Sequence, residues 1–244
     1  MEAANPELHE APPEKRAAYL SILQAAAEEG IPFAVGGSVA MSSYCGTLRP
    51  VKDLDVYVVA ADKDRMVAIL KAQGFEDYFD RVAYDRAWIY RAVLDDLIVD
   101  VIWQMANRRA GVDECWLTRG PVVEFENLPI RLLPVEEMIW NRLYVLQRDR
   151  CDWPDVFNLL DVASDRIDWL HLKNRLKDDV SLLTALLHVY AWLRPDMAVR
   201  VLSWTPEADA TPAAGKELTE SRVRLLDSRP WLVSTTREDK PVKC

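Results

Sequence analysis

Residues 33–59, FAVGGSVAMSSYCGTLRPVKDLDVYVV, constrain the fold more than any other part of the chain. A short apolar run ends at two adjacent glycines, and a later run of β-branched residues carries aspartates at alternate positions. The glycines predict a sharp turn between a strand and a helix, because glycine adopts backbone conformations that other residues avoid. The alternation predicts a strand with two different faces. This stretch therefore indicates an α/β protein.

Helical and strand-like segments alternate on both sides of this stretch. A helix is expected from Glu14 to Glu29, because Gly30 and Pro32 stop it. The strand PFAV, the helix SVAMSSYC, the strand LDVYVVA and the helix DKDRMVAILKAQG follow. Two further strand-like runs, RVAYDRAWIYRAV and DLIVDVIWQ, are separated by the turn signal Asp95-Asp96. The order predicts an α/β (α+β) domain over residues 14–133, with a mixed sheet and flanking helices.

The pattern becomes helical after residue 133. Pro134 followed by two glutamates is typical of a helix start and predicts one helix over PVEEMIWNRLYVLQRD. The segments CDWPDVFNLLDVAS, DWLHLKNRLK and DVSLLTALLHVYAWLR read as further helices. We therefore expect a C-terminal helical bundle over residues 134–205, between a frayed N-terminus (1–13) and a loosely structured tail (206–244).

Composition excludes several classes of function. A net charge of −9 speaks against nonspecific binding to nucleic acid, although a local basic groove remains compatible with it. No apolar run approaches the roughly 20 residues of a membrane span, and the N-terminus lacks a secretory signal. The four cysteines are scattered and only three histidines are present, which argues against zinc sites and disulfide frameworks. A cytoplasmic protein without a membrane partner is expected.

The glycine turn, residues Gly36, Gly37 and Ser38, stands before a predicted helix. Backbone N–H groups at a helix N-terminus bind phosphate oxygens, helped by the helix dipole. Ser38 could cap the helix or hydrogen-bond a phosphate. By itself this sequence also fits an ordinary turn and cap. Both interpretations stay open at this point.

Three acids, Asp53, Asp55 and Asp100, lie on predicted strands. Asp53 and Asp55 point to the same face about 7 Å apart and could bind one divalent cation or bracket two. An exposed strand start with Asp53 as a turn residue is the alternative. Asp100 lies within an apolar run, where an unpartnered carboxylate is costly, so it should face a ligand, a cation or the other acids. Together with the glycine turn, the three acids indicate a phosphate and metal site.

This motif set resembles the nucleotidyltransferase superfamily typified by DNA polymerase beta. GGS is followed fifteen residues later by DLD and then by an aspartate on a later strand. The C-terminal PVEEMIWNRLYVLQRDRCDWPDVFNLL is similar to small bacterial nucleotidyltransferase-like proteins related to abortive-infection toxins. The resemblance covers roughly residues 14–195.

The resemblance implies an enzyme that transfers a nucleoside monophosphate from an NTP to a hydroxyl acceptor and releases pyrophosphate. The glycine turn would hold the triphosphate. Asp53 and Asp55 would bind two Mg²⁺ ions, or Mn²⁺ in their place. Asp100 would complete the catalytic metal site and help to activate the acceptor hydroxyl. One ion would favour the attacking oxygen and the other the leaving pyrophosphate.

Four outer residues are further candidates for nucleotide binding. Arg49 and Lys52 precede the acids and could neutralise phosphate charge, or they are ordinary surface cations. Asn141 stands where relatives commonly have lysine on the first C-terminal helix. It shares a predicted helical face with Arg148, which we expect to line a cleft. The change to asparagine implies weaker triphosphate binding, compensated by Arg142 or Arg148, or else a loss of activity.

The acceptor stays open among a small molecule, a tRNA end and a protein hydroxyl. An acidic protein suits a cationic small molecule. The toxin-like relatives suit tRNA or protein, with an antitoxin-like protein as a partner. The alternative function is a non-catalytic nucleotide-binding or protein-interaction module that keeps the fold. Asn141 favours that alternative, and the retained acids argue against it.

Overall fold

A computed structural model describes residues 13–46, 51–204 and 224–226. None of the helices in these ranges is long and apolar enough to cross a membrane. The three cysteines within them are not in disulfides, and Cys244 lies outside the described residues.

The chain forms two compact units, each held together by contacts within itself. The first contains the described residues of Met1–Met138 together with Asn158–Ile167. The second contains those of Ile139–Phe157 and Asp168–Cys244.

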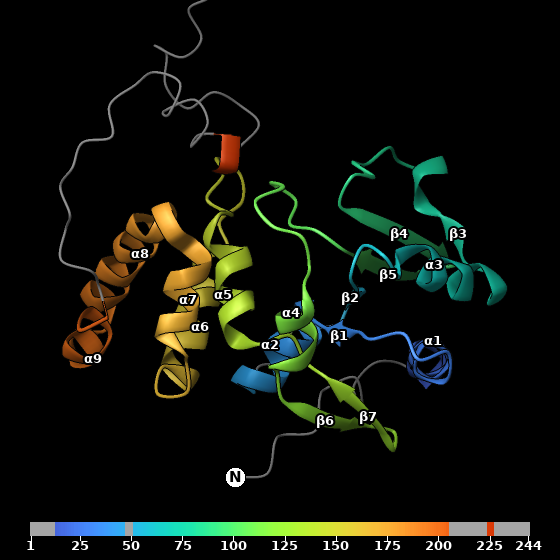
Figure 1. Ribbon diagram of the computed structural model, residues 1–244, viewed down its shortest axis with the longest axis horizontal. Helices are drawn as coiled ribbons and strands as arrows, with labels where there is room; N and C mark the ends of the chain where they lie inside the picture. The colour runs from blue at the N-terminus through green and yellow to red at the C-terminus, as the bar shows by residue number, and fades with distance from the viewer. Residues whose placement is uncertain (1–12, 47–50, 205–223, 227–244) are drawn as a thin grey trace, which may run out of the picture. The chain divides into compact units, whose positions relative to one another are not determined.

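The first unit is built on a five-stranded mixed sheet in the order β1-β2-β5-β4-β3 (Figure 1). β2 and β5 are parallel, and the other neighbouring pairs are antiparallel. A separate two-stranded sheet is formed by β6 and β7. The strands are β1 Ala34–Val35, β2 Leu54–Tyr57, β3 Glu76–Asp77, β4 Ile89–Leu94, β5 Leu97–Ile102, β6 Val122–Phe125 and β7 Leu128–Arg131. The expected mixed α/β class is confirmed.

Two-residue loops set the register of both hairpins. β4 and β5 turn at Asp95 and Asp96, and Asp95 has φ +52°. β6 and β7 turn at Glu126 and Asn127, with φ +47° and +70°. Positive φ is typical of the turns whose twist matches a hairpin. The predicted turn at Asp95-Asp96 is therefore confirmed, whereas the second hairpin was not predicted.

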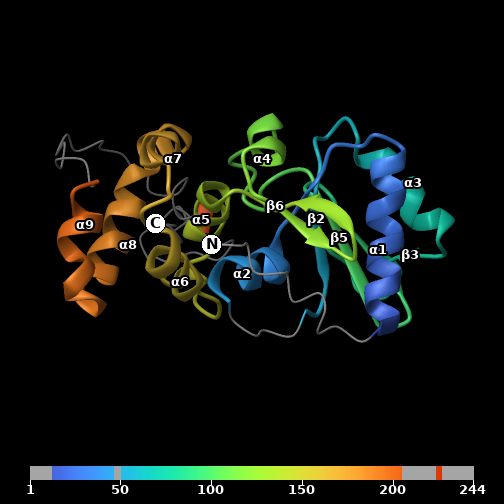
Figure 2. The same ribbon diagram turned by 90° about the horizontal axis from the view of Figure 1, so that it is seen from below.

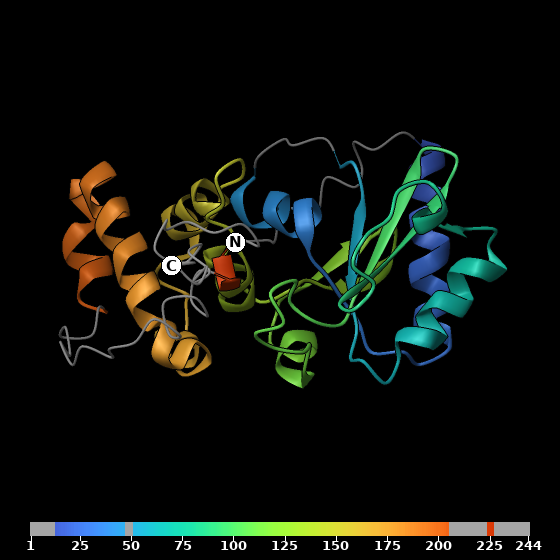
Figure 3. The same ribbon diagram turned by 90° about the horizontal axis from the view of Figure 1, so that it is seen from above.

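Helices cover both faces of the five-stranded sheet (Figure 3). α1 (Pro13–Glu28) and α3 (Lys63–Ala72) pack on one face, and α2 (Gly37–Cys45) lies on the other. α4 (Glu114–Thr118) precedes the β6–β7 hairpin. The inner face of α1 follows the helical period, and its fully buried residues are Tyr19, Ile22, Leu23 and Ala26. Opposite them, alternate strand residues are also fully buried: Leu54 and Val56 on β2, and Val99 and Val101 on β5. One face of β2 and β5 is therefore apolar, and Asp55 and Asp100 lie on the opposite face.

The C-terminal region is helical, as expected (Figure 2). Its α-helices are α5 Val135–Leu143, α6 Trp153–Ala163, α7 Trp169–Leu176, α8 Val180–Leu193 and α9 Ala198–Leu202. α8 buries residues at spacings of three and four, which is the pattern of a helix with one apolar face.

The helix α5 is shorter than predicted. It ends at Leu143, whose carbonyl accepts a hydrogen bond from the Trp153 indole N–H at 3.0 Å. The following residues form a tight turn, with an isolated β-bridge between Leu146 and Cys151. Arg148 lies in this turn, so the prediction that it shares a helical face with Asn141 is wrong.

Candidate functional site

The glycine turn lies directly against the acid-bearing strand. The Gly36 N–H donates a hydrogen bond of 3.0 Å to the Asp55 carbonyl. Gly37 has φ +56°, and a Cβ atom placed on it would lie 1.6 Å from Asp55 Oδ2. A Cβ on Gly36 would lie 2.4 Å from the Tyr57 ring, which is buried and stacked on Trp116. Both glycines are therefore required by close approach, and the turn and the acids form one site.

Ser38 lies in the first turn of α2. Its Oγ is enclosed and finds no hydrogen-bond partner among the residues that the structure describes. A buried hydroxyl without a partner costs about 1–3 kcal/mol. A ligand oxygen that accepted a hydrogen bond from Ser38 Oγ would remove this cost.

One residue from each of three adjacent strands forms a row across the sheet. Asp55 on β2 is paired in register with Asp100 on β5, and Asp100 is paired with Arg91 on β4. Side chains of paired positions lie on the same face of a sheet. Asp53 immediately precedes β2 and belongs to the same face by the alternation of the strand. The three acids therefore lie on one face, and a cation lies beside them.

Arg91 binds Asp100 through both carboxylate oxygens. Its Nε donates to Oδ1 at 2.8 Å, and its Nη2 donates to Oδ2 at 2.5 Å. The Asp100 side chain is only 3% exposed, and Arg91 Nη2 also lies 4.0 Å from Asp53 Oδ2. The hydrogen bonds to Asp100 raise the pKa of the Arg91 guanidinium. Burial raises the pKa of the Asp100 carboxyl and Arg91 opposes that shift. We assign both groups as ionised, because arginine keeps its proton and both carboxylate oxygens accept from it.

Arg91 is a site residue that was not predicted, although the sequence holds the signal. Once a two-residue turn at Asp95-Asp96 is accepted, counting outward on both strands pairs Arg91 with Asp100. Asp100 was expected to face a cation, a ligand or the other acids. The cation that it faces is the Arg91 guanidinium.

The oxygen donors that could hold a metal ion are those of Asp53 and Asp55. Carboxylate oxygens are the protein ligands that Mg²⁺ prefers, and the Asp53 side chain is one-third exposed. Across the described ranges, no three histidine, cysteine, aspartate or glutamate side chains are grouped so as to hold one ion jointly. Asp53 and Asp55 thus carry the ligand type that suits a divalent ion, and Asp100 is held by Arg91.

The chain matches the model of a family described as uncharacterised nucleotidyltransferase, over residues 14–193. The match covers well over half of the chain. The chain belongs to this nucleotidyltransferase family.

Solved structures of nucleotidyltransferases are similar to this chain. An antigenic nucleotidyltransferase-like protein from Paracoccidioides brasiliensis is 13% identical, with a TM-score of 0.51 over 82% of this chain and 97% of that chain. The antibiotic-resistance factor ANT(2'')-Ia is 18% identical, with a TM-score of 0.47 over 75% and 96%. The lincosamide antibiotic adenylyltransferase LnuA is 14% identical, with a TM-score of 0.44 over 62% and 98%. The first of these similarities shows a shared fold. No individually curated protein matches the chain.

The outer candidate residues of this nucleotidyltransferase are distributed over both units. Lys52 is exposed and directly precedes Asp53 in the first unit. Arg49 lies outside the described residues. Asn141 lies on α5 in the second unit, and Arg148 lies in the turn that follows. Nucleotide binding by these four residues stays a prediction.

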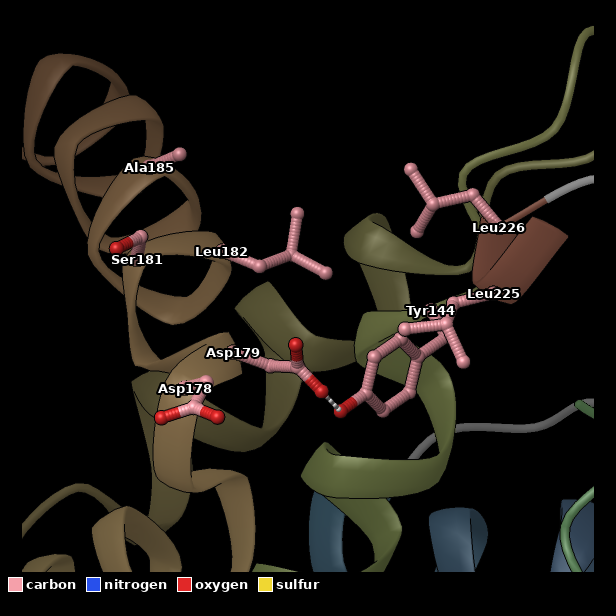
Figure 4. Close-up of a pocket in the computed structure, with 8 residues that line it drawn as sticks. All are labelled: Tyr144, Asp178, Asp179, Ser181, Leu182, Ala185, Leu225 and Leu226. Carbon is pink, nitrogen blue, oxygen red and sulfur yellow. Dashed lines mark hydrogen bonds between the residues drawn. The ribbon is translucent and has the colours of Figure 1, made fainter. Parts of the chain in front are cut away.

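A pocket with a volume of about 260 Å³ lies within the second unit (Figure 4). Tyr144 forms one wall, and its hydroxyl donates a hydrogen bond of 2.6 Å to Asp179 Oδ2. The remaining lining residues are Asp178, Ser181, Leu182, Ala185, Leu225 and Leu226. The lining contains none of the predicted site residues, so the glycine turn and the acids are a separate site.

Proposed function

We propose that this nucleotidyltransferase moves a nucleoside monophosphate from an NTP to a hydroxyl acceptor, with Mg²⁺ as cofactor and pyrophosphate as the second product. The contact between Gly37 and the Asp55 carboxylate carries the proposal. It joins a helix N-terminus, which suits phosphate, to carboxylates, which suit a divalent ion. The acceptor oxygen would form a bond to the α-phosphorus as the bond to the bridging oxygen breaks.

The residues of the site have distinct parts in the proposal. The glycine turn would bind phosphate oxygens through backbone N–H groups at the start of α2 and through the Ser38 hydroxyl. Asp53 and Asp55 would hold the metal, which when bound supplies positive charge to the triphosphate and the leaving pyrophosphate. Asp100 would contribute through the Arg91 guanidinium, which it fixes beside Asp53.

The acceptor is proposed only as a class. A cationic small molecule suits the net charge of −9, because an acidic protein attracts cations from solution. A tRNA end and a protein hydroxyl are the other two classes, and an antitoxin-like partner belongs to them. A cytoplasmic location is proposed from the scattered cysteines.

Thermal unfolding with each of the four NTPs, with and without Mg²⁺, tests the donor site without knowledge of the acceptor. A ligand at 100 times its dissociation constant stabilises a protein by about 2.7 kcal/mol. For a chain of this length we expect the Tm to rise by about 5–10 °C. The rise should require Mg²⁺ and should be largest for the preferred NTP.

Two double variants test whether the Mg²⁺-dependent rise in Tm comes from Asp53 and Asp55. Asp53→Asn/Asp55→Asn should lose the Mg²⁺-dependent rise. Asp64→Asn/Asp80→Asn removes the same number of negative charges from exposed positions and should keep it. An unchanged rise in the first variant, or no rise with any NTP in the native chain, would contradict the proposed donor site.

A further inference from the structure

The Arg91 side chain places a positive charge beside the three acids of the site. Asp53, Asp55 and Asp100 together bring three negative charges, and the Arg91 guanidinium brings one positive charge. Two negative charges remain, and a single divalent ion would neutralise them. A second divalent ion would bring the protein part of the site to a positive charge before any nucleotide binds.

Two features of Asp100 oppose metal binding at its carboxylate. Its carboxylate is almost completely buried, and both of its oxygens accept hydrogen bonds from Arg91. A Mg²⁺ ligand must lie about 2.0–2.1 Å from the ion, so a metal at Asp100 would have to displace the guanidinium. Displacement is opposed by the loss of two charge-assisted hydrogen bonds in a buried place.

Asp53 differs from Asp100 in its exposure and in its distance from Arg91. The Asp53 side chain is 33% exposed, and its distance of 4.0 Å to Arg91 is longer than that of a hydrogen bond. The absence of a side chain on Gly37 leaves room for the Asp55 carboxylate itself, because a Cβ there would lie 1.6 Å from Asp55 Oδ2. The Asp53 carboxylate keeps access to an ion that arrives with a nucleotide.

We propose that Arg91 takes the place of a second divalent cation, so that the site binds one divalent ion, at Asp53 and Asp55, together with the nucleotide. The inference rests on the proposed function, because it concerns the cations of the same site. Arg91 and Asp100 are positioning residues in this account.

The number of bound ions tests the inference directly. The native chain is titrated with Mn²⁺ in the presence of the α,β-methylene analogue of the preferred NTP, which cannot transfer its nucleotidyl group. Native mass spectrometry then counts the ions in each protein–nucleotide complex. We expect one Mn²⁺ per complex in the native chain and two in Arg91→Gln, because that variant releases the Asp100 carboxylate.

Matched variants control for charge and folding. Arg91→Lys keeps the positive charge and should bind one ion. Arg86→Gln removes an arginine from a neighbouring ion pair, with Asp77 at 2.5 Å, and should also bind one. Asp100→Asn should still bind a single ion, because Asp100 does not ligate it. The amide oxygen that this last variant introduces can still accept a hydrogen bond from Arg91, which favours its folding. The ion counts of the native chain and of Asp100→Asn therefore test the inference even if Arg91→Gln does not fold.

The outcomes separate the inference from the proposed function. Two ions in the native complex would overturn the inference and leave the donor site standing. A folded Arg91→Gln that still binds one ion would also overturn it. A native chain that binds neither the analogue nor Mn²⁺ would overturn both.

Discussion

Asp55→Asn is expected to lower the rate of nucleotidyl transfer by about a thousandfold. Asp55 lies at the centre of the site, between Gly37 and Asp100, and its carboxylate is one of the two proposed metal ligands. A metal ion supplies several kcal/mol of charge stabilisation in such transition states, and each 1.36 kcal/mol is a factor of ten in rate. The measurement follows label from an α-³²P NTP into a mixture of metabolites and RNA, which requires no prior choice of acceptor.

Asp64→Asn is the matched control, because it makes the same chemical change at an exposed position on α3. It should transfer label at the native rate. Equal labelling by Asp55→Asn and the native chain would remove Asp55 from the mechanism. A native chain that binds NTP and Mg²⁺ but labels no acceptor in the mixture would favour the non-catalytic alternative.

Gly37→Ala is expected to abolish the Mg²⁺-dependent stabilisation by NTP while the chain still folds. The new Cβ would overlap Asp55 Oδ2 and also lie 2.7 Å from its Cγ, so the carboxylate has to rotate out of the site. The positive φ of Gly37 adds about 1–2 kcal/mol of backbone strain for alanine. Urea unfolding measures the lost stability, and thermal unfolding with NTP and Mg²⁺ measures the lost binding.

Gly46→Ala separates these two effects. Gly46 follows the same helix with φ +63°, and among the described residues no atom beyond its own chain neighbours crowds the position of its Cβ within 4 Å. This variant should lose a similar amount of stability through backbone strain and keep its full response to NTP. If Gly37→Ala also keeps the full response, the contact with Asp55 is not what the site requires.

The central elements of the fold could be predicted because their signals are local. The turn at Gly36-Gly37, the helix closed by Gly46 and the β-branched strand after Lys52 all follow from adjacent residues. The Asp95-Asp96 turn fixed the hairpin in the same way. Such features depend on backbone conformations that few residue types adopt.

Elements that depend on distant contacts were missed or misplaced. β3 contains only Glu76 and Asp77 and exists through its pairing with β4. The end of α5 is set by a hydrogen bond from Trp153, ten residues further along the chain. Neither contact leaves a periodic pattern in the sequence, so propensity alone extended the helix to include Arg148.

For the candidate site, the acids could be predicted from their own neighbours in the sequence, whereas the cation beside them follows from the register of the β4–β5 hairpin. Asp100 required a partner because its neighbours are apolar, and that argument follows from burial alone. The neighbours of Arg91 in the sequence do not distinguish it from any other strand arginine. Its significance follows from the register of the sheet, which pairs it with Asp100.

The β4–β5 hairpin has a consequence for the order in which the site assembles during folding. Arg91 and Asp100 are nine residues apart and are joined by a tight turn, so their contact closes a short loop. Asp55 meets Asp100 only after the chain between them, including α3, has been placed. Because short loops close faster than long ones, we expect β4 and β5 amides to gain protection before β2 amides in pulsed hydrogen exchange. Asp100 would then be neutralised by Arg91 before Asp55 arrives, so the parallel pairing of β2 and β5 is not opposed by an uncompensated charge.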